Sequence, residues 1–184
     1  ADSLYAIRKL VFEEKKVTLS EYKKALALNF GKGFDAITVQ EMTKEIIKEF
    51  VKAGQQPSQA QIAGIVKGIM DTEIPDKDKE LCERLLAMIE EVPKYGNDIE
   101  EVDMFAREVA YTYTKPLQNY RNPRGGIFQA GLYPVSANVP LGAQTGATPD
   151  GRLAHTPVAD GVSPTAGRDI NGPTATANSV SKLD

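Results

Sequence analysis

Helical periodicity is clearest in the stretch Glu80-Leu81-Cys82-Glu83-Arg84-Leu85-Leu86, near the middle of the chain. Apolar residues recur there at steps of three and four, and the pattern continues through Met88, Ile89 and Val92. This spacing places the apolar side chains on one face of an α-helix, which can pack against neighbouring helices. The stretch therefore predicts a helix over residues 76–91 and a helical layer around it.

The same period recurs through residues 1–121, where helix ends can also be located. Side-chain caps followed three residues later by Glu or Gln are the capping-box arrangement or its Asp analogue, and they mark four helix starts, at Thr18, Thr38, Ser58 and Asp98. Gly54 suits a C-terminal cap, since glycine readily adopts the left-handed conformation found there. The predicted helices span residues 3–14, 19–29, 39–53, 59–70, 76–91 and 99–114.

Residues 122–184 have a different composition, with nine of the 15 glycines, seven of the 11 prolines and only eight charged residues. No helical period is visible before the last residues, and the best strand candidate is 126–133. Pro173 can open a final helix over 174–184, because proline suits the first turn. We expect loops and short strands packed around a site, which makes the fold class α+β.

Composition excludes several classes of protein. The chain has 184 residues, 41% of them hydrophobic and 26% charged, with a net charge of -3, as expected for one soluble globular domain. Charges of both signs are interleaved, so no basic surface indicates nucleic acid. No apolar run could span a membrane, and the first residues do not resemble a signal peptide. We therefore expect a cytoplasmic protein.

The usual metal and phosphate motifs are missing. A single cysteine, Cys82, and a single histidine, His155, exclude a Cys-rich zinc site, and no metal site is predicted. The helical context of Cys82 favours a buried structural thiol over a reactive one, and His155 is interpreted as structural rather than as an acid or base. No phosphate-binding glycine motif occurs, and the turn at Asp169 lacks the other calcium ligands. The residues alone define no reaction.

Longer motifs in the second part carry a family resemblance. They occur in order as Gly131-Leu132-Tyr133-Pro134-Val135-Ser136-Ala137-Asn138-Val139-Pro140-Leu141-Gly142, Thr145-Gly146-Ala147-Thr148-Pro149-Asp150-Gly151-Arg152, Ala159-Asp160-Gly161-Val162-Ser163-Pro164, Asn171-Gly172-Pro173-Thr174-Ala175 and Ser179-Val180-Ser181-Lys182-Leu183-Asp184. This succession resembles glycyl radical enzymes of the pyruvate formate-lyase-like superfamily, most closely their glycerol and diol dehydratases.

The resemblance implies a fold and a domain organisation. It makes the chain part of a larger enzyme, a ten-stranded α/β barrel wrapped in helices. Residues 1–121 would form a helical layer, and residues 122–184 would supply barrel-lining loops and strands that end in a short helix. The pair of helices over 34–72 departs from the family pattern, and we interpret it as a helical insertion, with a partner-binding module as the alternative.

The resemblance also implies a reaction. In such enzymes a backbone glycine stores a radical, which an activating enzyme of the radical SAM type installs, and a cysteine in a Gly-Cys-x-Glu-like loop abstracts hydrogen from the substrate. Neither the glycine loop nor the cysteine loop occurs in this sequence. No catalytic residue and no cofactor-binding residue is therefore assigned within the chain, Cys82 is not given the radical role, and the chain alone is expected to be inactive.

Two residues are predicted to bind substrate. By resemblance, Tyr133 and Ser136 lie on a segment that approaches the barrel interior, where a phenol offers an apolar wall and one hydrogen bond to a substrate hydroxyl. The alternative for Tyr133 is a core tyrosine bonded to backbone.

The predicted function is radical elimination of water from a small polyol by the parent enzyme. The remainder of the polypeptide, the activating enzyme and the substrate are the implied partners, and a homodimer is expected. A formate C-acetyltransferase-like enzyme and a non-catalytic assembly or binding module remain as alternatives.

Overall fold

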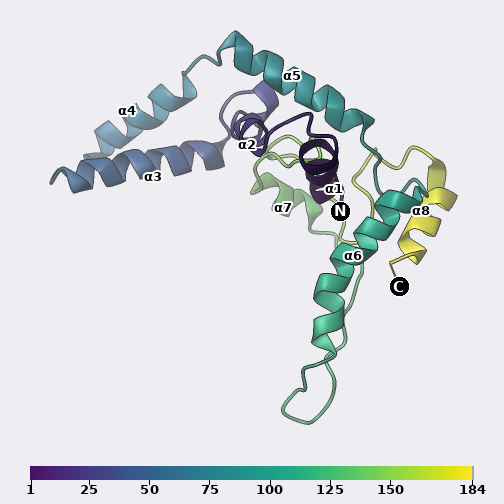
Figure 1. Ribbon diagram of the computed structural model, residues 1–184. Helices are drawn as coiled ribbons and strands as arrows, with labels where there is room; N and C mark the ends of the chain where they lie inside the picture. Colours follow the sequence, from purple (N-terminus) through teal and green to yellow (C-terminus); the bar gives the residue numbers. More distant parts are fainter. Residues whose placement is uncertain (184) are drawn as a thin grey trace.

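A computed structural model describes residues 1–183 of the chain, and its elements are almost all helical (Figure 1). Helix α1 continues into a π-helical turn, and a short 3₁₀ turn follows α2. The α-helices are α1 (Asp2–Ile7), α2 (Leu19–Ala27), α3 (Ala36–Lys52), α4 (Gln59–Met70), α5 (Asp76–Glu91), α6 (Glu100–Leu117), α7 (Asn138–Ala143) and α8 (Gly172–Ser181).

The hydrophobic core lies among α1, α2, α5 and α6. Its fully buried side chains include Tyr5, Tyr22, Leu85, Ile89 and Val102, which come from all four helices. Each side chain of this size contributes about 1.5–3 kcal/mol when it leaves water. The periodic stretch in α5 therefore faces the core as predicted, with Leu85 wholly buried.

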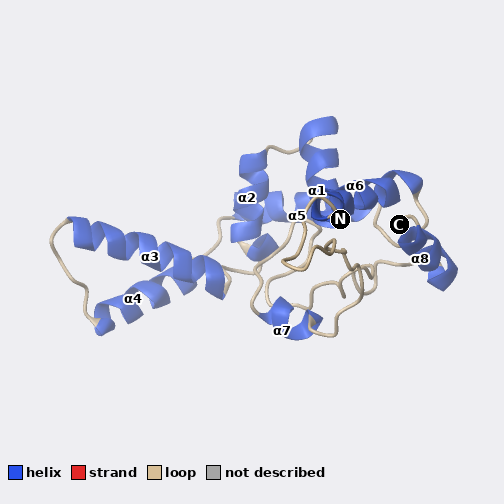
Figure 2. Cartoon of the chain, turned by 90° about the horizontal axis from the view of Figure 1, so that it is seen from below, coloured by secondary structure: helices blue, strands red, loops and turns tan. Residues whose placement is uncertain are grey.

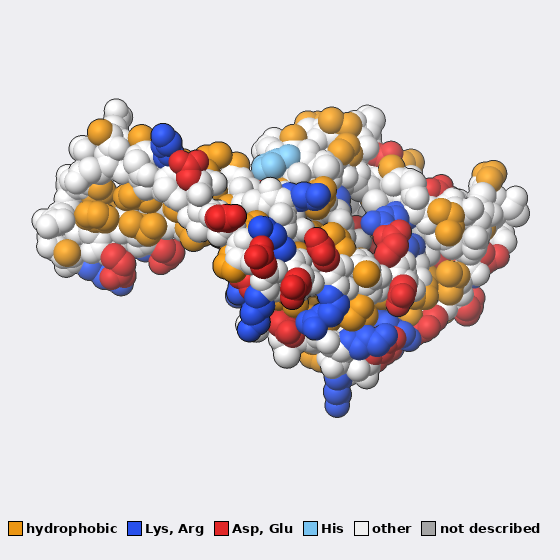
Figure 3. All heavy atoms as spheres, turned by 90° about the horizontal axis from the view of Figure 1, so that it is seen from above, with side chains coloured by type: hydrophobic (Ala, Val, Ile, Leu, Met, Phe, Trp, Pro, Cys, Tyr) orange, Lys and Arg blue, Asp and Glu red, His pale blue; other side chains and the backbone are white. Residues whose placement is uncertain are grey.

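Helices α3 and α4 form a hairpin that projects from this body (Figures 1 and 2). Val39, Thr43 and Ile69 of these helices are buried, whereas Ile46 and Val66 keep part of their surface exposed. Hydrophobic side chains gather along the hairpin at the left of the space-filling view (Figure 3). The two helices predicted within 34–72 therefore form, while their status as an insertion stays a prediction.

Two of the four predicted caps form. Thr18 and Ser58 each accept a hydrogen bond from the backbone N–H three residues ahead and complete a capping box. The cap predicted at Thr38 is wrong, because Asp35 accepts bonds from the N–H groups of residues 37 and 38 and starts α3 earlier. The cap predicted at Asp98 is also wrong, because its carboxylate instead accepts hydrogen bonds from two side chains of α8 and the turn after it.

The short strands predicted in the second part do not form in the described residues. Only an isolated bridge joins Arg121 to Ile127. A strand needs a neighbouring strand to pair its backbone, and the segment 129–136 finds no such neighbour within residues 1–183. The barrel itself therefore lies beyond what this structure shows.

One helix was missed and another is shorter than predicted. Helix α7 contains Pro140, but the proline falls in the first turn, where its missing N–H costs nothing. Helix α8 begins at Gly172 and ends at Ser181, so the prediction over 174–184 is confirmed in part. Asp184, where that prediction ended, lies outside the described residues.

Candidate functional site

The predicted substrate-binding segment crosses a tight turn of the chain. Gly161 lies so close to the backbone of Tyr133 that a Cβ on Gly161 would overlap the Tyr133 carbonyl oxygen and would lie 3.3 Å from Cα of Pro134. Gly161 has φ = 58°, in the left-handed region that glycine adopts without strain. The crossing therefore requires glycine for two reasons, the close approach and the backbone conformation.

The turn beneath Tyr133 is held by its own backbone. The N–H of Gly161 donates to the carbonyl of Ala159 at 3.1 Å, and the N–H of Ser163 donates to the carbonyl of Asp160 at 3.0 Å. These bonds give residues 159–163 a defined shape against which the segment 132–134 packs. The backbone hydrogen bonds of this turn thus support the segment that is predicted from the sequence to bind substrate.

The crossing borders two cavities. The smaller has a volume of about 310 Å³ and is lined by α1, α6 and the loops 148–152 and 158–165. The larger, of about 800 Å³, lies between α6, the segment 127–132 and α8. Leu132, Val162 and Leu183 line both cavities and so separate one from the other.

Tyr133 and Ser136 line neither cavity within the described residues. Tyr133 is 64% exposed, and its ring lies over Gly131, where a Cβ would come within 3.0 Å of Cε1. Ser136 is also exposed and lies in a turn before α7. The structure therefore places both predicted residues on the surface of this segment and leaves their role as a prediction.

Two buried carboxylates lie at the smaller cavity. Oδ1 of Asp2 accepts a hydrogen bond from the N–H of Tyr95 at 2.9 Å, and the hydroxyl of Ser3 donates to Asp150 at 2.6 Å. Burial raises the pKa of Asp2, the bond from Tyr95 opposes that rise, and the charge of Asp150 adds to it. The lining also includes Arg152, so this cavity carries charged groups of both signs.

Arg152 holds together the loop between α7 and the turn at Gly161. Its guanidinium donates to the carbonyls of Leu153 at 3.0 Å and Thr156 at 2.6 Å, and it also binds the carbonyl of Gly146. Burial lowers the pKa of Arg152. Because these donors are used within the loop, Arg152 is unsuited to phosphate binding, in line with the sequence analysis. His155, the single histidine, places Nδ1 2.8 Å from the carbonyl oxygen of Ala143 and so also holds this loop.

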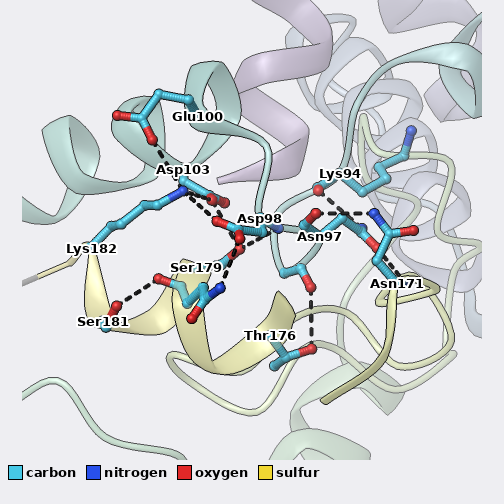
Figure 4. A network of polar contacts seen from close by, with 12 residues as sticks. Lys94, Asn97, Asp98, Glu100, Asp103, Asn171, Thr176, Ser179, Ser181 and Lys182 are labelled. Atoms are coloured by element: carbon cyan, nitrogen blue, oxygen red, sulfur yellow. Dashed lines mark hydrogen bonds and ion pairs between the residues drawn. The ribbon is translucent and has the colours of Figure 1, made fainter. Parts of the chain in front are cut away.

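A polar network fastens α8 to the start of α6 (Figure 4). The hydroxyl of Ser179 donates to Oδ2 of Asp103 at 2.9 Å, and the ammonium of Lys182 donates to the same oxygen at 3.0 Å and to Asp98 at 2.7 Å. Asp103 is fully buried. Hydrogen bonds to Asp98 and Asp103 raise the pKa of Lys182, and the bonds from Lys182 and then Asn178 lower the pKa of Asp98.

Asparagine side chains extend this network towards the turn before α8. The amide nitrogen of Asn97 donates to the carbonyl of Arg168 at 2.8 Å, and the amide of Asn171 donates to the carbonyl of Asn97 at 3.0 Å. Sequence reasoning missed the network, because its partners are more than 70 residues apart and no local pattern relates them. The network joins the loop between α5 and α6 to the turn before α8.

Cys82 lies in the core rather than at the site. Its side chain is fully buried in α5, and burial raises the pKa of the thiol. The structural position predicted for this cysteine is therefore confirmed. Within residues 1–183 no three His, Cys, Asp or Glu side chains lie close enough together to hold a metal ion, and no described helix is long and apolar enough to cross a membrane.

Known proteins share this fold. The chain has a TM-score of 0.89 and 60% identity to a structure titled for 1,2-propanediol dehydration in Roseburia inulinivorans, covering 100% of this chain and 22% of that one. It has a TM-score of 0.65 and 42% identity to the glycerol-bound B12-independent glycerol dehydratase from Clostridium butyricum, covering 100% of this chain and 17% of that one. A probable dehydratase of Escherichia coli K12 is 44% identical over 146 residues, 76% of this chain and 17% of that protein.

The pyruvate formate lyase-like family model matches residues 1–142, and the chain belongs to this family. The family inferred from the motifs is thereby confirmed, and the relatives just described are dehydratases by name or title. The chain spans about a fifth of the length of these relatives.

Proposed function

We propose that this chain forms part of a glycyl radical dehydratase that removes water from a small vicinal diol. The observation that carries the proposal is the 60% identity over the whole chain to the protein studied for 1,2-propanediol dehydration. The similarity to a glycerol-bound dehydratase supports the same substrate class at lower identity. The substrate is therefore 1,2-propanediol or glycerol.

Residues of this chain would bind the substrate and shape the pocket. Tyr133 would supply an apolar ring and one hydrogen bond to a substrate hydroxyl, and Ser136 a second polar contact. Both are exposed here and can face a pocket completed by further polypeptide. The segment 129–136, which pairs with no strand within residues 1–183, would pair with strands of the α/β barrel.

The radical chemistry would come from outside these residues. A glycyl radical installed by a radical SAM activating enzyme supplies the hydrogen-abstracting power through a cysteine, and neither that glycine loop nor that cysteine loop occurs in the 184 residues. Cys82 is buried in the core and takes no part. The enzyme would be a homodimer in the cytoplasm of an anaerobic cell.

The experiment is turnover by the complete, anaerobically activated enzyme that contains this sequence. With 1,2-propanediol we expect propanal and one water per turnover, and with glycerol 3-hydroxypropanal. The matched control is pyruvate with coenzyme A. Acetyl-coenzyme A and formate in that control, without aldehyde from either diol, would favour the formate C-acetyltransferase-like alternative.

A substitution tests the predicted site within that enzyme. Tyr133→Phe removes one hydrogen bond, and we expect kcat/KM for the diol to fall about tenfold, equivalent to about 1.4 kcal/mol. The melting temperature should hardly change, because the ring is exposed in this structure. Unchanged kcat/KM with a lower melting temperature would instead identify a core tyrosine.

A further inference from the structure

The close approach between Gly161 and the Tyr133 backbone sets where the Tyr133 ring can lie. A Cβ at 161 would overlap the carbonyl oxygen of Tyr133, so any larger residue must displace residues 133 and 134. Pro134 restricts the compensating rotation, since its φ is fixed by the ring. The displacement would therefore be passed to Tyr133 rather than absorbed by the residue after it.

A second glycine constrains the ring itself. The Tyr133 ring lies over Gly131, where a Cβ would come within 3.0 Å of Cε1 and 3.2 Å of Cδ1. The ring is thus folded back on its own segment while its carbonyl is pressed against the turn at Gly161. Both glycines contact Tyr133 itself, and its ring otherwise stays exposed.

We infer that Gly161 is a positioning residue for Tyr133, and that it fixes the depth at which the phenol meets the substrate. The inference rests on the proposed function and names the residue that supports its site. Gly161 itself would not contact the substrate. It acts by leaving room for the Tyr133 carbonyl, so that the phenol keeps one position when a hydroxyl of the diol arrives.

Gly167 provides a matched control. It also has a left-handed backbone, with φ = 78°, but a Cβ there meets no atom within 4 Å. Gly167→Ala therefore carries the conformational strain of alanine at positive φ without any collision. A difference between Gly161→Ala and Gly167→Ala isolates the contact with Tyr133 from the backbone strain.

The first experiment is a double-mutant cycle on diol turnover by the complete enzyme. We expect Gly161→Ala to lower kcat/KM about tenfold and Gly167→Ala to change it less than twofold. In the Tyr133→Phe background, Gly161→Ala should cost less than about twofold more, because both changes disable the same phenol. Losses that multiply to about a hundredfold would overturn the inference while leaving the substrate contact of Tyr133 intact.

A second experiment does not depend on activity. With 3-fluorotyrosine at position 133 of the complete enzyme, Gly161→Ala should shift the ¹⁹F resonance, and Gly167→Ala should leave it in place. An unshifted resonance, or a Gly161→Ala chain that does not fold while Gly167→Ala folds, would overturn the inference. If instead Tyr133→Phe turns over normally and the resonance still shifts, the positioning holds and only the substrate contact fails.

Discussion

The α3–α4 hairpin and the junction between α6 and α8 hold their helices together in different ways. In the hairpin, buried apolar side chains such as Val39 and Ile69 come from two helices that are consecutive in the chain, and Ser58 caps the second helix locally. At the junction, the fully buried Asp103 binds Ser179 and Lys182, whose positions lie 76 and 79 residues away. Local order can therefore be predicted from the sequence, whereas the placement of α8 depends on a buried charge.

The largest expected effect comes from removing the cation at the junction. Lys182→Met leaves the buried carboxylate of Asp103 without its charged partner, and breaking a buried pair in this way should cost about 3 kcal/mol of unfolding free energy. Urea unfolding of the chain measures it. Lys48→Met is the control, because its pair with Glu45 lies on the exposed side of α3, and equal losses in the two variants would contradict the comparison.

A cavity in the hairpin should have a smaller and more local effect. Ile69 is buried against α3, and Ile69→Ala should cost about 2 kcal/mol, near the lower end for such truncations because the hairpin can relax. Amide hydrogen exchange should quicken in residues 36–70 and stay unchanged in α5. Faster exchange throughout the core would show that the hairpin and the body unfold as one unit.

Loss of one helix cap should be smaller still. Ser58→Ala removes the side-chain acceptor for the N–H of Gln61, which should destabilise α4 by about 1 kcal/mol. Circular dichroism melting of the variant beside Ser20→Ala, whose serine lies one residue after the first position of α2, checks the result. A similar loss from both serines would mean that capping is not the cause.

The smallest expected effect is a change in the pH dependence of the junction. The pKa of Asp98 lies below its ordinary 3.8, so its contribution to stability is present above that value and is lost as pH falls through the lowered folded pKa. The raised pKa of Asp2 acts in the opposite sense, since protonation of Asp2 favours the fold. Asp98→Asn should therefore flatten the acid loss of stability as pH falls below 3.8, measured by urea unfolding at each pH. An unchanged slope of unfolding free energy against pH would show that Asp98 does not contribute to the acid loss of stability.

Sequence alone located most of the helices and half of their caps. Period and capping predicted α4 and α5 at the observed bounds, because both signals arise within a few residues. It failed where a partner lies far along the chain: Asp98 is drawn to Lys182 instead of capping α6, and the segment 126–133 makes only an isolated bridge, from Ile127 to Arg121. Strand pairing and buried charge pairs are non-local, and no spacing along the chain encodes them.

At the candidate site, too, the sequence predicted individual residues but not a contact between distant positions. The motifs pointed to Tyr133 and Ser136 through resemblance, and the structure adds the turn at Gly161 that lies against the Tyr133 carbonyl. That contact joins positions 28 residues apart and leaves no trace except a glycine, a residue with many other uses. Only coordinates distinguish the glycine pressed against a carbonyl from Gly167, which meets nothing.

The buried thiol of Cys82 can also be used to measure transient opening of the core. It is the single cysteine, it lies wholly inside the core, and its raised pKa keeps it in the poorly nucleophilic thiol form. A thiol-directed reagent can therefore modify the native chain only during moments when α5 separates from its neighbours. The labelling rate would therefore time the separation of α5 from α2 and from the turn at Asn29–Gly31, which contact it.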